Sequence, residues 1–143
     1  MRIVAYIFGV LLLLYVFYCL IVEIKENYES KEEDPVVRDL AEKLRTIDPR
    51  VDKIVPKLRF YKGDKSYTID KKHVHLCMAD KKTNEIYPMN QLILVLLHEI
   101  AHAICIEVGH TALFHQIYEE LLLAAELAGL YDDSIPHIDG YCE

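Results

Sequence analysis

Three polar residues lie inside one of the most apolar stretches of the chain. His98, Glu99 and His102 interrupt residues 92–106, which are otherwise apolar and predict a helix buried on most sides. Residues four apart on a helix lie about 40° apart around its axis and about 6 Å apart along it, so both imidazoles can converge on one ion. Glu99 projects from the edge of the helix face that carries both histidines, where its carboxylate can reach a water molecule bound to that ion. The HExxH spacing therefore predicts a metal site with a general base.

The competing interpretation is a pair of neutral histidines that form hydrogen bonds within the core. Burying two histidines and an ionisable glutamate without compensation would cost several kcal/mol. This desolvation cost favours the metal site.

A hydrolytic zinc site needs a third protein ligand and an open fourth position. Cys105 lies on the same face of the helix as His98 and His102. It would be about 10 Å from His98 along the helix axis, too far to bind the same ion, so we expect it in the core. His110 follows Gly109, which can end a helix in the left-handed conformation and turn the next side chain back to the metal. This turn makes His110 the preferred third ligand.

Two carboxylates are rivals for the third position. Glu119 and Glu120 lie in a second predicted helix, which begins after its N-cap Thr111. Their positions match zinc sites in which a second helix supplies a carboxylate ligand. We prefer His110 because of the turn, and we expect His115 to be a supporting or surface residue.

The sequence HEIAH followed by GHTALF resembles the HExxH, GH and x-x-F/W pattern of the small WLM and SprT-like zinc metallopeptidases. The resemblance covers residues 67–123 and implies a zincin-like fold, Zn²⁺ as the cofactor and a protein or peptide substrate. It carries over to the ligands, the base and an aromatic residue behind the site: His98, His102, His110, Glu99 and Phe114. The segments SYTIDKKHVHLCMAD and YDDSIPHIDGYCE resemble short WLM-like proteins encoded by large DNA viruses.

The N-terminal part of the chain predicts a membrane anchor. Residues 3–22 are 20 consecutive uncharged residues, enough to cross a bilayer as a helix. A cleaved signal peptide is the alternative, but its apolar run is usually roughly 7 to 15 residues and no small-x-small cleavage site follows here. We predict an anchor over residues 1–22, a charged linker over 23–34 and a metallopeptidase domain over 35–143. Positive charges on both sides of the anchor leave its orientation open.

The rest of the chain predicts an α+β domain around the motif. Asp34 and Pro35 begin a helix with one apolar face, and it stops before Asp48 and Pro49. Residues 50–57 fit either a short helix or a loop. Three short strands then form a small sheet, over residues 58–61, 67–69 and 74–78.

We expect the segment from His73 to Met78 to be the edge of this sheet that binds a substrate backbone by strand addition. His73 and His75 alternate with apolar neighbours, which indicates a solvated strand face.

The C-terminal segment offers side chains that could stabilise an oxyanion. Tyr131, His137 and Tyr141 are the candidates, and the sequence selects none of them. Of the four cysteines, Cys77 and Cys142 could pair. The absence of an N-x-S/T sequon favours a cytosolic face for the domain.

These features together predict a membrane-anchored zinc endopeptidase in which Glu99 is the general base. The small domain also fits a zinc-stabilised structural or partner-binding membrane protein without turnover. A third possibility is a protease that acts on proteins bound to nucleic acid. The formal charge of −7 and the absence of a basic patch argue against that substrate.

Overall fold

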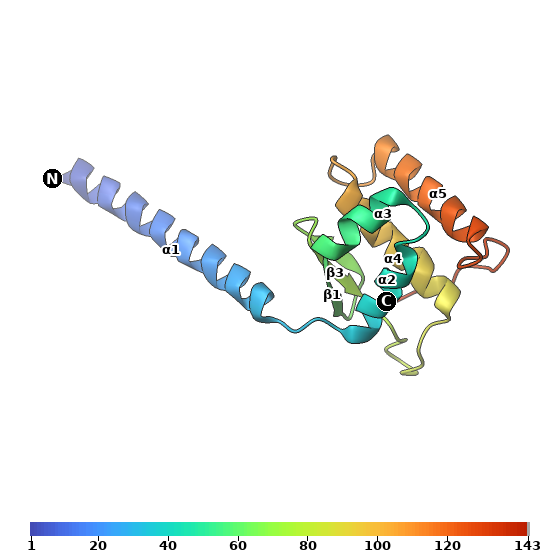
Figure 1. Cartoon of the computed structure of the whole chain (residues 1–143). Helices are drawn as coiled ribbons and strands as arrows, with labels where there is room; N and C mark the ends of the chain where they lie inside the picture. Colours follow the sequence, from blue (N-terminus) through green and yellow to red (C-terminus); the bar gives the residue numbers. More distant parts are fainter. Residues whose placement is uncertain (143) are drawn as a thin grey trace. The chain divides into compact units, whose positions relative to one another are not determined.

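The chain forms two units, residues 1–32 and residues 33–143. The structure is a computed structural model and describes residues 1–142, apart from the side chains of residues 2–5 and 25–30. Figure 1 gives the order of the elements along the chain.

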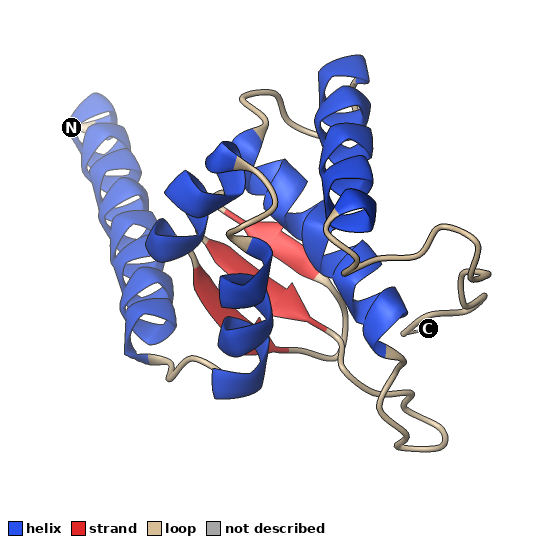
Figure 2. Ribbon diagram, turned by 45° about the vertical axis from the view of Figure 1, so that its right-hand side comes forward, coloured by secondary structure: helices blue, strands red, loops and turns tan. Residues whose placement is uncertain are grey.

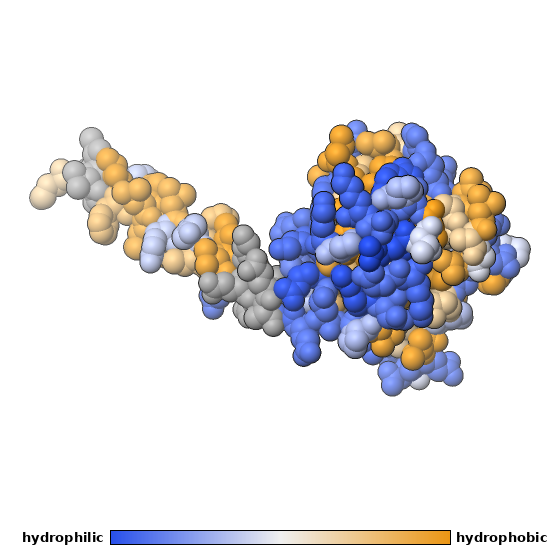
Figure 3. Space-filling model, in the orientation of Figure 1, coloured by the Kyte–Doolittle hydropathy of each residue, from blue (hydrophilic) through white to orange (hydrophobic). Residues whose placement is uncertain are grey.

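The first unit is a single helix, α1 (Arg2–Ser30). Residues Tyr6–Ile24 have a mean hydropathy of 2.6 and are long and apolar enough to cross a membrane, although a signal sequence has the same properties. Their large apolar side chains are exposed, in contrast to the mostly hydrophilic face of the second unit (Figure 3). The helix does not stop at residue 22. It continues to Ser30, so the first part of the predicted linker is helical.

Two capped helices open the second unit. Asp34 accepts hydrogen bonds from the backbone of Val36 and Val37 at 2.9 and 3.0 Å, which confirms the predicted start of α2 (Pro35–Leu44). The helix ends at Leu44, earlier than predicted, because Asp48 caps a separate helix, α3 (Pro49–Ile54). A 3₁₀ turn, η1 (Val55–Lys57), follows, so the ambiguous segment is helical.

The sheet has three strands, β1 (Arg59–Lys62), β2 (Tyr67–Ile69) and β3 (His73–Leu76), in the order β1-β3-β2 (Figure 2). β3 pairs parallel with β1 and antiparallel with β2. The prediction that the segment from His73 to Met78 is a sheet edge is therefore wrong, because both sides of β3 are already hydrogen-bonded. The edge strands are β1 and β2.

The prediction of a solvated face for His73 and His75 is also wrong. Both side chains are buried. The rings of Tyr61 and Tyr67, from the two flanking strands, stack on His75 with centroids 4.9 and 4.5 Å away, and the Tyr61 hydroxyl lies 3.2 Å from Nδ1 of His73. Cross-strand aromatic pairs of this kind stabilise a sheet and exclude water from it.

Two long helices complete the domain, α4 (Met89–Ile104) and α5 (Ala112–Leu127). α4 lies between the sheet and α5, and it contacts β2, β3, α3 and α5 (Figure 2). The core consists of side chains from the sheet and both helices, among them Phe60, Val74, Leu76, Leu97, Ile100, Phe114 and Leu121. Each of these contributes roughly 1.5–3 kcal/mol by its burial.

The α+β class is thus confirmed. A disulfide joins Cys77 to Cys142, which confirms the predicted pairing, and Cys105 is a buried free cysteine as expected.

Candidate metal centre

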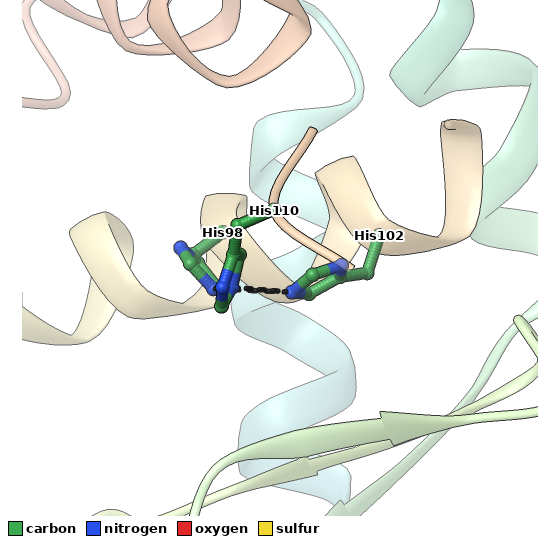
Figure 4. Close-up of side chains that lie close together, drawn as sticks. All are labelled: His98, His102 and His110. Carbon is green, nitrogen blue, oxygen red and sulfur yellow. Dashed lines mark hydrogen bonds between the residues drawn. The ribbon is translucent and has the colours of Figure 1, made fainter. Parts of the chain in front are cut away.

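Three histidines meet at the elbow between α4 and α5 (Figure 4). His98 and His102 project from successive turns of α4, and His110 comes from the loop that follows it. Their Nε2 atoms lie 3.2 Å apart for His98 and His102, 3.0 Å for His98 and His110, and 3.1 Å for His102 and His110. The structure therefore brings together the three predicted ligands.

Hydrogen bonds alone cannot explain this triangle. Each ring nitrogen carries either one proton or one lone pair, so a nitrogen cannot donate to one neighbour and accept from the other. A cation satisfies all three lone pairs at once. His98, His102 and His110 would hold such an ion with three nitrogen ligands, and a catalytic zinc site has three protein ligands.

The surroundings of His98 and His102 favour the neutral form of imidazole, which is the form that binds a metal. Burial, followed by the proximity of His102 and His110, lowers the pKa of His98 to about 4. Burial, followed by the positive potential of His110 and Lys71, also lowers the pKa of His102. Protons therefore compete weakly with a metal at these two residues near neutral pH.

The loop that carries His110 turns at Gly109, as the sequence predicts. Gly109 has φ +85°, a left-handed conformation that suits glycine, and it directs the next residue back toward α4. Thr111 then caps α5 by accepting a hydrogen bond from the backbone of Phe114 at 3.3 Å. The ring of Phe114 is fully buried behind the site and stacks on His102 with a centroid distance of 4.2 Å.

The rival carboxylates do not join the cluster. Glu120 is exposed and forms an ion pair with Arg50 at 2.8 Å, and Glu119 is also exposed. The face of α5 that meets the site presents Tyr118 instead, whose ring packs edge-on against His98 at 5.1 Å. His115 is exposed, with its ring centroid 6.2 Å from that of His110, so it is a surface neighbour of the site.

Glu99 is buried beside the cluster, with 5% of its surface exposed. Burial raises the pKa of its carboxyl to about 7, and a hydrogen bond from Thr68 partly opposes this rise. The Thr68 hydroxyl lies 2.8 Å from Oε2 of Glu99 and 3.1 Å from its carbonyl oxygen. Thr68 belongs to β2, and no local pattern in the sequence connects it with Glu99.

Lys71 is a second residue that the sequence analysis missed. Its ammonium donates to the carbonyl oxygens of His102 at 3.3 Å, of Glu107 at 3.0 Å and of Cys105, where α4 ends and the loop toward His110 begins. Its backbone has φ +52°, as does that of Asp70, so the β2–β3 turn adopts a left-handed conformation without glycine. The turn thus places a cation at the negative end of the helix dipole.

A cleft runs past the metal centre in two adjoining parts that share Ser66, His98 and Glu99. The first part, of about 780 Å³, is also lined by Thr68, Lys71, His102 and His110, among others. The second part, of about 460 Å³, is lined by Leu94, Val95, Tyr118 and Tyr141, among others. An extended ligand could therefore pass the three histidines on both sides of Glu99.

Of the candidate oxyanion donors, Tyr141 lines the cleft. Tyr131 and His137 are hydrogen-bonded to each other at 3.1 Å and do not line either part of it.

Curated relatives of the chain come from large DNA viruses. It is 46% identical over 91 residues to uncharacterized protein 136R of Invertebrate iridescent virus 6, covering 62% of this chain and 51% of that protein. It is 40% identical over 85 residues to uncharacterized protein 042R of Invertebrate iridescent virus 3, covering 59% and 54%. A match to uncharacterized protein R325 of Acanthamoeba polyphaga mimivirus is 39% identical over 75 residues, covering 52% and 36%.

The chain thus spans about half the length of the two iridescent-virus proteins. No family model matches it, and no solved structure does. The predicted resemblance to proteins of large DNA viruses is confirmed. The comparisons support neither membership of the WLM or SprT-like peptidases nor any activity.

Proposed function

We propose that this protein is a membrane-anchored, zinc-dependent endopeptidase with a minimal zincin-like domain, in which Glu99 is the general base. The observation that carries the proposal is the convergence of three histidine nitrogens within 3.2 Å of one another, beside a buried carboxylate and in an open cleft.

The donor set fits zinc. Three imidazole nitrogens within 3.2 Å of one another suit Zn²⁺, whereas Mg²⁺ and Ca²⁺ prefer oxygen ligands. A structural zinc site is normally closed by four protein ligands. Among the residues that the structure describes, this cluster offers three, so its fourth position is open to a substrate or water. The set therefore favours a catalytic site over a purely structural one.

Zinc would polarise the scissile carbonyl and acidify a water molecule in the open position. Glu99 would take a proton from a water molecule in the cleft and pass it to the leaving amine. Thr68 holds the carboxylate in place through its hydrogen bond to Oε2.

The strand β2 is the proposed place for the substrate backbone. It is an edge strand of the sheet, and Ser66, Tyr67 and Thr68 line the cleft beside the metal centre. An extended peptide that adds to this edge would pass directly in front of Glu99. β2 thus takes the role that the sequence analysis gave to the segment from His73 to Met78.

The apolar part of α1 is the proposed membrane anchor, and it would confine the peptidase to substrates at a membrane surface. The viral relatives suggest a host or virion membrane.

The decisive experiment replaces the proposed base. Glu99→Gln keeps the size and the hydrogen bond from Thr68 but removes the proton acceptor. In the full chain purified in detergent, we expect one bound zinc per chain and a fall of at least about 100-fold in cleavage of a peptide library. Glu119→Gln, an exposed glutamate, is the matched control and should cleave like the wild type.

Metal content is measured by mass spectrometry, and cleavage is measured with and without a chelator. Wild-type cleavage by Glu99→Gln, or cleavage that resists the chelator, would refute the proposed mechanism.

A further inference from the structure

The lining of the second part of the cleft is mixed: Lys65, Ser66, His98 and Glu99 are polar, and five further residues contribute apolar surface. Leu94 and Val95 come from α4 and Tyr118 from α5, while Tyr141 and Cys142 come from the C-terminal tail. The volume, about 460 Å³, exceeds that of any single amino-acid side chain. Such a pocket binds apolar groups by removing them from water.

The Tyr141 hydroxyl belongs to a closed cycle of hydrogen bonds. The backbone N–H of Cys77 donates to Oγ of Ser66 at 2.9 Å, and the Tyr141 hydroxyl donates to the carbonyl oxygen of Cys77. Because that donation uses the one proton of the tyrosine, the 3.1 Å contact between Ser66 and Tyr141 must run from the serine hydroxyl to the tyrosine oxygen. The Tyr141 proton is therefore not available to a substrate oxyanion.

The tail that carries Tyr141 is tied down at several points. Cys142 forms the disulfide with Cys77, and its backbone N–H donates to the Tyr87 hydroxyl at 3.1 Å. The rings of Tyr87 and Tyr141 lie 4.6 Å apart. Further back, the N–H of Ile138 donates to Oε1 of Gln91 on α4 at 3.1 Å. Tyr141 is thus a fixed wall of the pocket.

We propose that Tyr141 determines substrate specificity. The pocket that it closes receives a large apolar side chain of the substrate residue next to the scissile bond. The Cys77–Cys142 disulfide maintains this selectivity because it holds the tail that carries Tyr141. The inference rests on the proposed function, because it assumes that a peptide lies across the metal centre. It assigns Tyr141 to substrate selection and not to oxyanion stabilisation.

The test uses two peptide hydroxamates that differ only in the side chain next to the zinc-binding group, which is either isobutyl or hydrogen. Binding to the zinc-loaded full chain in detergent is measured by titration calorimetry. We expect the isobutyl compound to bind at least about 10-fold more tightly, because its carbon atoms leave water.

Tyr141→Ala removes the ring that forms one wall of the pocket, and the double cysteine variant releases the tail that carries this ring. Tyr141→Ala should reduce the preference to less than about threefold, and Tyr141→Phe should keep it, because the ring forms the wall. Cys77→Ser combined with Cys142→Ser should also reduce it, because the tail is released, while the zinc content stays at one per chain. Leu127→Ala changes an exposed residue of α5 that lines neither part of the cleft and is the matched control.

Equal binding of the two compounds to the wild type, or an unchanged preference in both Tyr141→Ala and the disulfide variant, would overturn this inference alone. If neither compound binds in a zinc-dependent way, the proposed function as a zinc endopeptidase is refuted, and this inference is refuted with it.

Discussion

At the residue scale, the candidate metal centre depends on which side chain supplies the third nitrogen. His110 lies within 3.1 Å of both other histidines, whereas Glu120 is paired with Arg50 on the outside of α5. The choice follows from the direction of each side chain. A residue that emerges from the elbow points at α4, but one on the exposed face of α5 does not.

We therefore expect His110→Ala to weaken zinc binding by more than about 100-fold, because losing a direct ligand costs more than losing a supporting residue. Glu119→Ala and Glu120→Ala should bind zinc like the wild type. Zinc affinity is measured by competition with a chromophoric chelator. A stronger loss in either glutamate variant would favour a carboxylate ligand.

Lys71 is expected to act through the loop that carries His110. Lys71→Met removes the donor to three carbonyl oxygens at the end of α4, so the loop relaxes and zinc binding weakens by about 10-fold. Lys71→Arg should restore most of the affinity, and Lys82→Met, at an exposed position, should change nothing. A wild-type affinity in Lys71→Met would show that the loop is held by other contacts.

At the element scale, the helix boundaries follow from local capping. Asp34 and Asp48 each stand before a proline at the first helical position, and each accepts a backbone hydrogen bond from the new helix. Arg50, in the first turn of α3, donates a hydrogen bond to Asp48 and another to Glu120 on α5. The cap thus connects two helices that lie far apart in the sequence.

This arrangement predicts a pH dependence of stability. The Arg50 guanidinium lowers the pKa of Asp48, so the charged form is favoured in the folded protein. The resulting stabilisation is present above the unfolded pKa, about 3.9, and is lost as the pH falls through the lower folded pKa. Asp48→Asn keeps the cap but removes the charge, so it should cost up to about 1 kcal/mol at pH 7.

The free energy of unfolding is measured by urea titration between pH 7 and pH 3. The difference between the wild type and Asp48→Asn should shrink toward acid pH. A difference that grows toward acid pH would contradict the assignment.

At the scale of the whole molecule, the disulfide ties the C-terminal tail to the segment after β3. It joins residues 65 apart in the sequence, and a loop of this length is expected to contribute about 4 kcal/mol by restricting the unfolded chain. Disulfides persist in oxidising compartments. The bond therefore indicates an oxidising environment for this domain.

Replacing both Cys77 and Cys142 by serine should lower the free energy of unfolding by about 4 kcal/mol. The measurement is urea unfolding of the full chain in detergent, followed by tyrosine signals. Cys19→Ser, at a free cysteine of α1, is the control. Equal stability of the double variant and the wild type would mean that the tail adds nothing to the fold.

Features that depend on neighbours a few residues away were predictable from the sequence. The helix period placed His98 and His102 on one stripe, Gly109 marked the turn that directs His110, and aspartates followed by prolines marked two helix starts. Each of these rests on an interaction that spans at most about one turn of helix.

Only the tertiary structure decided the contacts between remote segments. The central position of β3, the hydrogen bond from Thr68 to Glu99, the reach of Lys71 and the cycle at Tyr141 all join residues that no local pattern connects. Alternation along a strand gives two faces, but it does not tell which strands pair or what covers each face. That choice depends on how the whole core packs, so it was settled by the fold and not by any one stretch of sequence.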